Sequence, residues 1–308
     1  MPSADDNSRL TGYLAAEGFT DDLLAELDGV EIEAVLGRLV LAKGPPRPAA
    51  WAQNVWFDPV RLPVVSIGEA AKALRGIQRN WACHAFHLHR RTSLIQERLP
   101  VVSAKPLEFG QPAPAAPLGS WTLVDEHTVL AAPRCSSPFP HGEAHFVEDK
   151  AVPPNRAYLK LWEAFTIIGA RPARGELCLD LGSSPGGWSW VLQGLGARVI
   201  SVDKAPLAPS IAALPGIEFR QQSAFALDPA EMPPVDWLCC DVICYPTRLL
   251  TMLERWMKAG RCRNFVCTLK FQGATDHATA KRFAAFPGSR LMHLSHNRHE
   301  LTWVRLSA

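Results

Sequence analysis

Four charged side chains fall at, or one residue before, the ends of four apolar runs in the C-terminal half of the chain. They are Asp180, Asp203, Asp241 and Lys270. Helix-like segments separate the runs, and this alternation is typical of a parallel α/β sheet. The carboxyl ends of parallel strands meet at one edge, where open α/β sheets bind their ligands. We therefore expect a ligand site with charged groups at this edge.

The loop after the first of these runs reads GSSPGG and occupies residues 182–187. A dinucleotide fingerprint would need its second glycine two residues after the first, and a phosphate-binding P-loop would need G-K-[ST]; neither is present. The loop instead suits a nucleoside that carries an amino-acid tail. Gly186 and Gly187 let the backbone approach such a ligand, and Asp203 is placed to accept hydrogen bonds from two ribose hydroxyls. A plain strand–turn–helix junction is the alternative.

Proline-rich stretches divide the chain, because proline fixes φ and has no N–H to donate. The pattern predicts an N-terminal α+β region, a Pro-rich linker, a connecting hairpin segment and an α/β domain. These parts span residues 1–104, 105–120, 121–150 and 151–308 respectively. In the first part, residues 35–42 are expected to form one strand. In the last part, the apolar runs 290–294 and 301–306 are expected to pair antiparallel.

The composition excludes several classes of protein. Of the 308 residues, 47% are hydrophobic and 20% charged, which is typical of a globular chain. No window approaches eighteen apolar residues, so we expect no membrane helix, and the polar N-terminus has no apolar signal region. The eight cysteines contain no C-x-x-C pair, which favours reduced thiols in a cytoplasmic protein. His84, His87 and His89 match no metal-ligand spacing, so no metal is expected.

The run DLGSSPGGWSWVL at 180–192 resembles the S-adenosylmethionine motif of the FtsJ-like methyltransferases. The resemblance implies a Rossmann-like methyltransferase sheet, with S-adenosyl-L-methionine as the cofactor. One departure is Ser223, where the family often has an acidic residue that reads the adenine amino group. The residues expected to bind the cofactor are Asp180, Gly182, Ser183, Ser184, Pro185, Gly186, Gly187, Trp188, Asp203, Ser223 and Asp241.

The same family carries a Lys-Asp-Lys-Glu tetrad, and four motifs place its members here. The motifs PPNRAYLKLWEAF, WLCCDVICYP, FVCTLKFQ and SHNRHELTWV imply Lys160, Asp241, Lys270 and Glu300 as catalytic residues. A ribose 2′-hydroxyl is a poor acid and needs a base. A lysine can serve only if burial and a nearby positive charge favour its neutral form. Lys160 would supply that charge beside Lys270, while the two acids would orient the ammonium groups.

Further motifs indicate a subgroup of the family. The SPF-x-x-G run near Ser137, the segment around Lys160, and the runs at 202–207 and 296–302 resemble those of the members that methylate a ribose of 23S ribosomal RNA. Those members begin with a THUMP-type RNA-binding region, and the front part here resembles a shortened, degenerate form of it. The resemblance therefore implies 2′-O-ribose methylation of RNA, with 23S rRNA or its precursor as the partner.

Two other functions remain open. A methyltransferase with a protein or small-molecule acceptor would not need the second lysine, so Lys160 together with Lys270 argues against it. A non-catalytic RNA-binding protein that retained the fold is disfavoured because all four tetrad residues are present. The net charge of +2 does not by itself indicate a polyanionic partner. Local basic clusters such as His89-Arg90-Arg91 nevertheless permit RNA binding.

Overall fold

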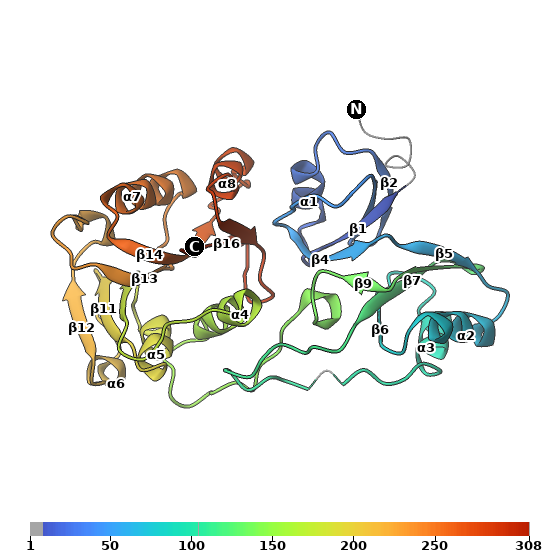
Figure 1. The fold of residues 1–308 in the computed structure, drawn as a ribbon, viewed down its shortest axis with the longest axis horizontal. Coiled ribbons are helices and arrows are strands. Elements are labelled where there is room, and N and C mark those ends of the chain that lie inside the picture. Colours follow the sequence, from blue (N-terminus) through green and yellow to red (C-terminus); the bar gives the residue numbers. More distant parts are fainter. Residues whose placement is uncertain (1–8, 104, 308) are drawn as a thin grey trace. The chain divides into compact units, whose positions relative to one another are not determined.

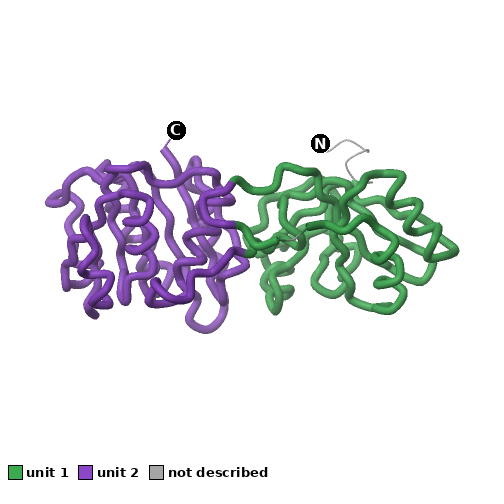
Figure 2. Tube along the Cα trace, turned by 90° about the horizontal axis from the view of Figure 1, so that it is seen from below, with its two compact units in different colours: residues 1–107, 112–145 green, residues 108–111, 146–308 purple. Residues whose placement is uncertain are grey.

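The computed structural model describes residues 9–103 and 105–307. The chain forms two compact units (Figure 2): unit 1 comprises residues 1–107 and 112–145, and unit 2 comprises residues 108–111 and 146–308. Each unit has its own sheets and core. None of the described helices is long and apolar enough to cross a membrane.

Unit 2 is built on one seven-stranded sheet with the order β12-β11-β10-β13-β14-β16-β15. The strands β12 to β14 run parallel, whereas β16 lies antiparallel between β14 and β15. The mixed α/β fold and the antiparallel final pair expected from the sequence are thereby confirmed. The strands are β10 (Leu177–Leu181), β11 (Arg198–Asp203), β12 (Ile217–Gln221), β13 (Val235–Cys240), β14 (Cys262–Lys270), β15 (Ser289–Met292) and β16 (Glu300–Arg305).

Helices cover both faces of this sheet (Figure 1), with α4 and α5 on one side and α7 and α8 on the other. Burial on both faces explains why strands such as β13 and β14 are apolar along most of their length rather than alternating. The helices are α4 (Tyr158–Ile168), α5 (Gly187–Gly194), the short α6 (Pro209–Ala212), α7 (Pro246–Ala259) and α8 (His277–Ala284).

The strand order reverses at the centre of the sheet. From β10 the chain proceeds outward through β11 to β12, and it then returns to place β13 on the other side of β10. The loops after β10 and β13 therefore diverge at their carboxyl ends, and such a reversal opens a ligand crevice in doubly wound sheets. Here the crevice is bordered by the glycine loop on one side and by Asp241 on the other.

Unit 1 contains a five-stranded sheet, β2-β3-β1-β4-β9, and a four-stranded sheet, β5-β8-β7-β6. Helices α2 and α3 pack on the four-stranded sheet around a core that includes Leu74, Trp81 and Trp121. The elements are β1 (Leu10–Ala15), α1 (Thr20–Glu26), β2 (Ile32–Leu36), β3 (Leu39–Lys43), β4 (Ala52–Phe57), β5 (Val60–Pro63), α2 (Ile67–Ile77), β6 (Trp81–Cys83), α3 (His89–Gln96), β7 (Gly119–Asp125), β8 (Thr128–Ala132) and β9 (Arg134–Cys135).

Two local features of unit 1 differ from the expectation. The single strand expected at 35–42 is wrong, because the chain turns at Gly37, whose φ is +63°, and forms the antiparallel pair β2 and β3. The hairpin of β7 and β8 is present. It pairs with β5 and β6 inside unit 1, so unit 1 extends past residue 104.

Candidate functional site

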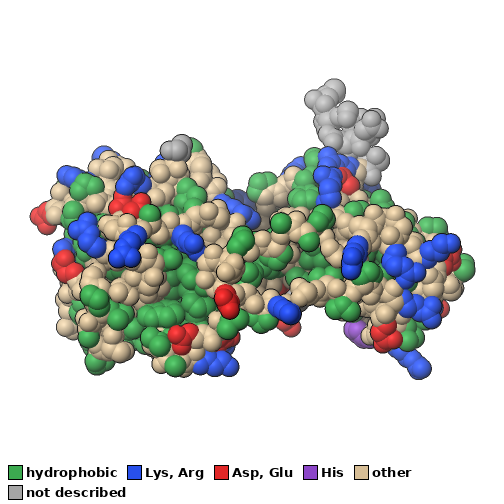
Figure 3. All heavy atoms as spheres, turned by 60° about the horizontal axis from the view of Figure 1, so that its bottom comes forward, with side chains coloured by type: hydrophobic (Ala, Val, Ile, Leu, Met, Phe, Trp, Pro, Cys, Tyr) green, Lys and Arg blue, Asp and Glu red, His purple; other side chains and the backbone are tan. Residues whose placement is uncertain are grey.

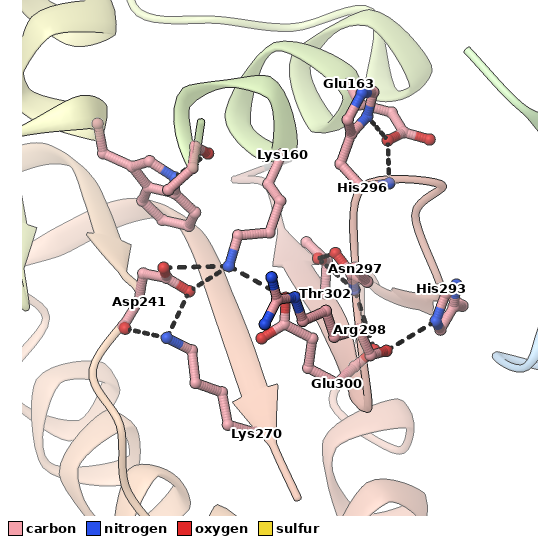
Figure 4. A network of polar contacts seen from close by, with 12 residues as sticks. Lys160, Glu163, Asp241, Lys270, His293, His296, Asn297, Arg298, Glu300 and Thr302 are labelled. Atoms are coloured by element: carbon pink, nitrogen blue, oxygen red, sulfur yellow. Dashed lines mark hydrogen bonds and ion pairs between the residues drawn. The ribbon is translucent and has the colours of Figure 1, made fainter. Parts of the chain in front are cut away.

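The four residues expected as a tetrad come together in unit 2 (Figure 4). Lys160 extends from α4, and its Nζ lies 2.8 and 3.0 Å from the two carboxylate oxygens of Asp241 and 3.1 Å from Oε1 of Glu300. Lys270, the last residue of β14, approaches Asp241 from the other side. Its Nζ lies 2.6 Å from the backbone oxygen of Asp241 and 3.1 Å from Oδ1. Asp241 is therefore the centre of the cluster.

Sheet register accounts for part of this arrangement. Glu300 is the first residue of β16 and lies directly opposite Lys270 of β14 in the antiparallel pair. Asp241 directly follows β13, and its N–H donates to the carbonyl of Leu181 at the end of β10. Neighbouring strand ends thus bring three of the four residues to one edge, and α4 supplies the fourth.

Lys160 is held in its charged form. Its side chain is 10% exposed, and this burial lowers the pKa, but the carboxylates of Asp241 and Glu300 outweigh it and raise the pKa above the usual value. Two lysines and two acids leave the cluster without net charge when all four are ionised. The arrangement therefore places a fixed positive charge close to Lys270 in a largely buried position.

A pocket of about 360 Å³ opens beside the cluster, and Asp241 and Lys270 both line it. Its opposite wall includes Asp203, the last residue of β11. The Asp203 carboxylate accepts hydrogen bonds from the N–H groups of Ser184 (3.0 Å) and Ala205 (2.9 Å). Asp203 therefore holds the glycine loop in place and still presents acceptor lone pairs to the pocket.

The glycine loop has the close backbone approach that its composition predicts. Gly182 has a φ of +77°, and a Cβ there would lie 2.8 Å from the backbone nitrogen of Val242. Gly186 has a φ of +121°, and a Cβ there would lie 2.7 Å from the side chain of Ile211. Larger residues would strain the backbone and push the loop away from its neighbours.

Of the residues expected to bind a cofactor, five line this pocket: Gly182, Ser184, Asp203, Ser223 and Asp241. The others do not. Ser183 and Trp188 are buried, and the Trp188 indole donates to the carbonyl of Ala157 (2.9 Å). Pro185, Gly186 and Gly187 shape the turn behind the pocket. Direct cofactor contact by these residues stays a prediction.

Asp180 also lies behind the pocket wall. Its carboxyl is fully buried and accepts a hydrogen bond from Ser189 (2.6 Å). Burial raises its pKa to about 7, which the bond from Ser189 only partly offsets. Asp180, which the sequence places at the ligand, is therefore buried behind the pocket, and its burial in the folded protein favours the protonated carboxyl.

Two features of the site were missed by the sequence reasoning. Arg248 lines the pocket and lies over the ring of Phe225, 3.9 Å from its centroid. Glu163, one turn after Lys160 on α4, is fully buried and accepts four hydrogen bonds from the segment before β16 (Figure 4). Their donors are the N–H (2.8 Å) and hydroxyl (2.9 Å) of Ser295, and the N–H (3.1 Å) and Nδ1 (2.6 Å) of His296. The available signal was an acid within the apolar run LKLWEAF.

The other histidine and cysteine side chains considered for metal binding or nucleophilic chemistry are His84, His87, His89, Cys239 and Cys240. Among residues 9–103 and 105–307, no three His, Cys, Asp or Glu side chains are grouped so that they could hold a metal ion. His84 contacts the carbonyl of Leu36 (3.2 Å). Burial raises the pKa of the Cys239 and Cys240 thiols, which disfavours the reactive thiolate.

Comparisons with known proteins find similar sequences and structures. Residues 153–279 match the model of the FtsJ-like methyltransferase family. Ribosomal RNA large subunit methyltransferase M from Aromatoleum aromaticum is 37% identical over 164 residues, which are 48% of this chain and 44% of that protein. The protein of the same name from Xanthomonas oryzae is 30% identical over 213 residues, covering 66% and 56% respectively. The chain spans about half the length of these curated relatives.

A solved structure also matches along most of the chain. It is TrmN from Thermus thermophilus, with a TM-score of 0.39 and 15% identity, covering 96% of this chain and 99% of that one.

Proposed function

We propose that the chain, whose residues 153–279 match the FtsJ-like methyltransferase family model, methylates a ribose 2′-hydroxyl of RNA. The proposed substrate is 23S ribosomal RNA or its precursor, and the proposed compartment is the cytoplasm. The observation that carries the proposal is the buried cluster of Lys160, Asp241, Lys270 and Glu300 at the edge of the pocket. A methyltransferase acting on a more acidic acceptor would not need two lysines there.

The pocket fits S-adenosylmethionine in size and in chemistry. Its volume of about 360 Å³ lies in the range of small-molecule sites. Asp203 would accept hydrogen bonds from the two ribose hydroxyls, and Ser223 would contact the adenine. The glycine loop leaves room for the amino-acid tail. When bound there, S-adenosylmethionine supplies an electrophilic methyl group on its sulfonium.

Lys270 would act as the base. A neutral lysine amine has two N–H groups and one lone pair. The contacts of Nζ with the backbone oxygen (2.6 Å) and Oδ1 (3.1 Å) of Asp241 use two donors. The lone pair then remains free to take the proton of a 2′-hydroxyl in the pocket.

The decisive experiment is methyl transfer to a 23S ribosomal RNA transcript that lacks its natural modifications, followed by mapping of the 2′-O-methyl position. Lys270→Ala should abolish transfer and leave the calorimetric affinity for S-adenosylmethionine nearly unchanged, because the lysine acts on the acceptor. Lys270→Arg should be equally inactive, since a guanidinium does not lose its proton near neutral pH. An active Lys270→Arg variant would show that positioning alone carries the reaction.

The pH dependence of the wild type tests the same role. The single-turnover rate should rise with pH until the base is neutral and then level off. A rate that stayed flat from neutral to alkaline pH would remove Lys270 as the base. The role left to it would then be to hold the RNA.

Basic side chains of unit 1 would contribute to RNA binding. Figure 3 shows Lys and Arg side chains gathered over the end of unit 1 formed by α2 and α3. Exposed side chains of these helices include Lys72, Arg75 and Arg90. Arg91 and, in unit 2, Arg156 are further proposed contacts. RNA affinity should fall steeply with added salt, because each phosphate contact releases counterions. A weak salt dependence, measured by filter binding, would argue against this surface.

A further inference from the structure

The loop between β13 and α7 exposes two large apolar side chains beside the pocket. Ile243 is 76% exposed and Tyr245 is 62% exposed, whereas the intervening Cys244 and the following Pro246 are buried. This alternation means that the loop has a buried side and a side that faces solvent. The exposed side therefore offers apolar surface next to the tetrad.

The loop is held in this conformation by its neighbours. The N–H of Asp241 donates to the carbonyl of Leu181 (3.0 Å), and Nζ of Lys270 donates to the carbonyl of Asp241 (2.6 Å). Val242 contacts the glycine loop so closely that no Cβ would fit at Gly182. These contacts hold the start of the loop in place. Leaving the two apolar side chains in water costs free energy that a ligand would recover.

Part of the exposed side of the loop borders the pocket. Ile243 lines the pocket together with Lys270. Tyr245 follows two residues later, directly before α7, and its place in the chain lies between two pocket-lining residues, Ile243 and Arg248. Arg248, in the first turn of α7, adds a positive charge to the same wall. An aromatic ring beside an aliphatic side chain and a cation matches the surface on which proteins stack single-stranded nucleic acid.

We infer that Ile243 and Tyr245 form a stacking platform for an unpaired base at the methylation site. This inference rests on the proposed function and adds a substrate class to it, namely RNA whose target nucleotide is single-stranded. The ring of Tyr245 supplies the stacking face, and Ile243 packs against the edge of the base. The platform orients the ribose so that its 2′-hydroxyl meets Nζ of Lys270.

The test measures single-turnover methylation of an unmodified 23S ribosomal RNA transcript at several enzyme concentrations. The variants are Tyr245→Ala, Tyr245→Phe and Ile243→Ala, with Val147→Ala as a matched control from an exposed position of unit 2. Tyr245→Ala should weaken the apparent affinity for RNA by about 5- to 100-fold, the range expected for the loss of one base–aromatic stack. Tyr245→Phe and Val147→Ala should behave as wild type, and the Tyr245 and Val147 variants should bind S-adenosylmethionine as the wild type does.

A second measurement addresses strandedness. After the methylated position is mapped, a complementary oligonucleotide is annealed over it, and wild-type methylation should fall at least tenfold. The inference is overturned if Tyr245→Ala stays within twofold of wild type, or if the paired target is methylated as fast as the unpaired one. A wild type that binds S-adenosylmethionine but methylates no RNA would overturn the proposed function, and this inference with it.

Discussion

Replacing Lys160 by methionine tests whether the buried cluster is built as described. Methionine keeps most of the side-chain volume and removes the charge. Glu300 would then be a buried carboxylate without a cation, because in the described part of the chain its only ion pair is with Lys160. Asp241 would keep Lys270 at 3.1 Å. Breaking a buried ion pair costs about 3–5 kcal/mol. Since one of the two acids stays paired, we expect the lower end, about 3 kcal/mol of unfolding free energy.

The contribution of Lys160 to the stability of the fold depends on pH. The pKa of Lys160 is raised by its two acids despite burial. Its contribution to stability is therefore fully present at neutral pH and is lost only as the pH rises through the folded-state pKa. In Lys160→Met the loss of unfolding free energy comes from the uncompensated negative charge on the buried Glu300. The double variant with Glu300→Gln should recover part of the loss at neutral pH.

The assay is equilibrium urea unfolding of the full chain, followed by tryptophan fluorescence. Added S-adenosylmethionine should shift only the transition of unit 2 and thereby identify it. Arg282→Met is the matched control, because Arg282 pairs with Glu254 at the surface (3.2 Å), and exposed pairs contribute about 1 kcal/mol or less. A loss of less than about 1 kcal/mol in the unfolding free energy of Lys160→Met, or no recovery in the double variant, would refute the reasoning.

Three further predictions concern the same unit. Glu163→Gln should lower the free energy of unfolding by about 3 kcal/mol or more, because an amide can replace only two of the four charge-assisted hydrogen bonds of Glu163. An unchanged urea unfolding curve would contradict this. Burial raises the pKa of Asp180 to about 7, so its contribution to stability is full in acid and is lost as the pH rises through about 7. Asp180→Asn should therefore reduce the fall in melting temperature between about pH 4 and 7, and an unaltered pH profile would argue against it. Asp203→Ala should weaken S-adenosylmethionine binding by about 2–4 kcal/mol, and unchanged calorimetric affinity would remove Asp203 from the site.

The outline of unit 2 could be predicted from local signals. Apolar runs of strand length, each followed by a charged residue or a glycine loop, indicated a parallel sheet with a ligand edge, and β10, β11, β13 and β14 lie where the runs predicted. The spacing of the glycines also separated this loop from phosphate-binding loops. These inferences worked because strand formation and turn conformation depend mainly on neighbouring residues.

Other features depended on contacts that local patterns do not carry. Residues 35–42 formed two strands because Gly37 allowed a turn inside an apolar run. The Trp188 indole donates to the carbonyl of Ala157, 31 residues earlier in the chain and directly before α4.

The chain's residue types and motif spacings determined which side chains were available for chemistry, including all four members of the tetrad. Only the tertiary structure decided that Lys160 bridges Asp241 and Glu300, which lie 81 and 140 residues further along the chain. It also decided that Glu163 holds Ser295, 132 residues away. Burial and charge pairing arise from residues that meet only when the sheet and α4 pack together. For that reason the protonation and the partners of these groups are properties of the fold, whereas their identities are properties of the sequence.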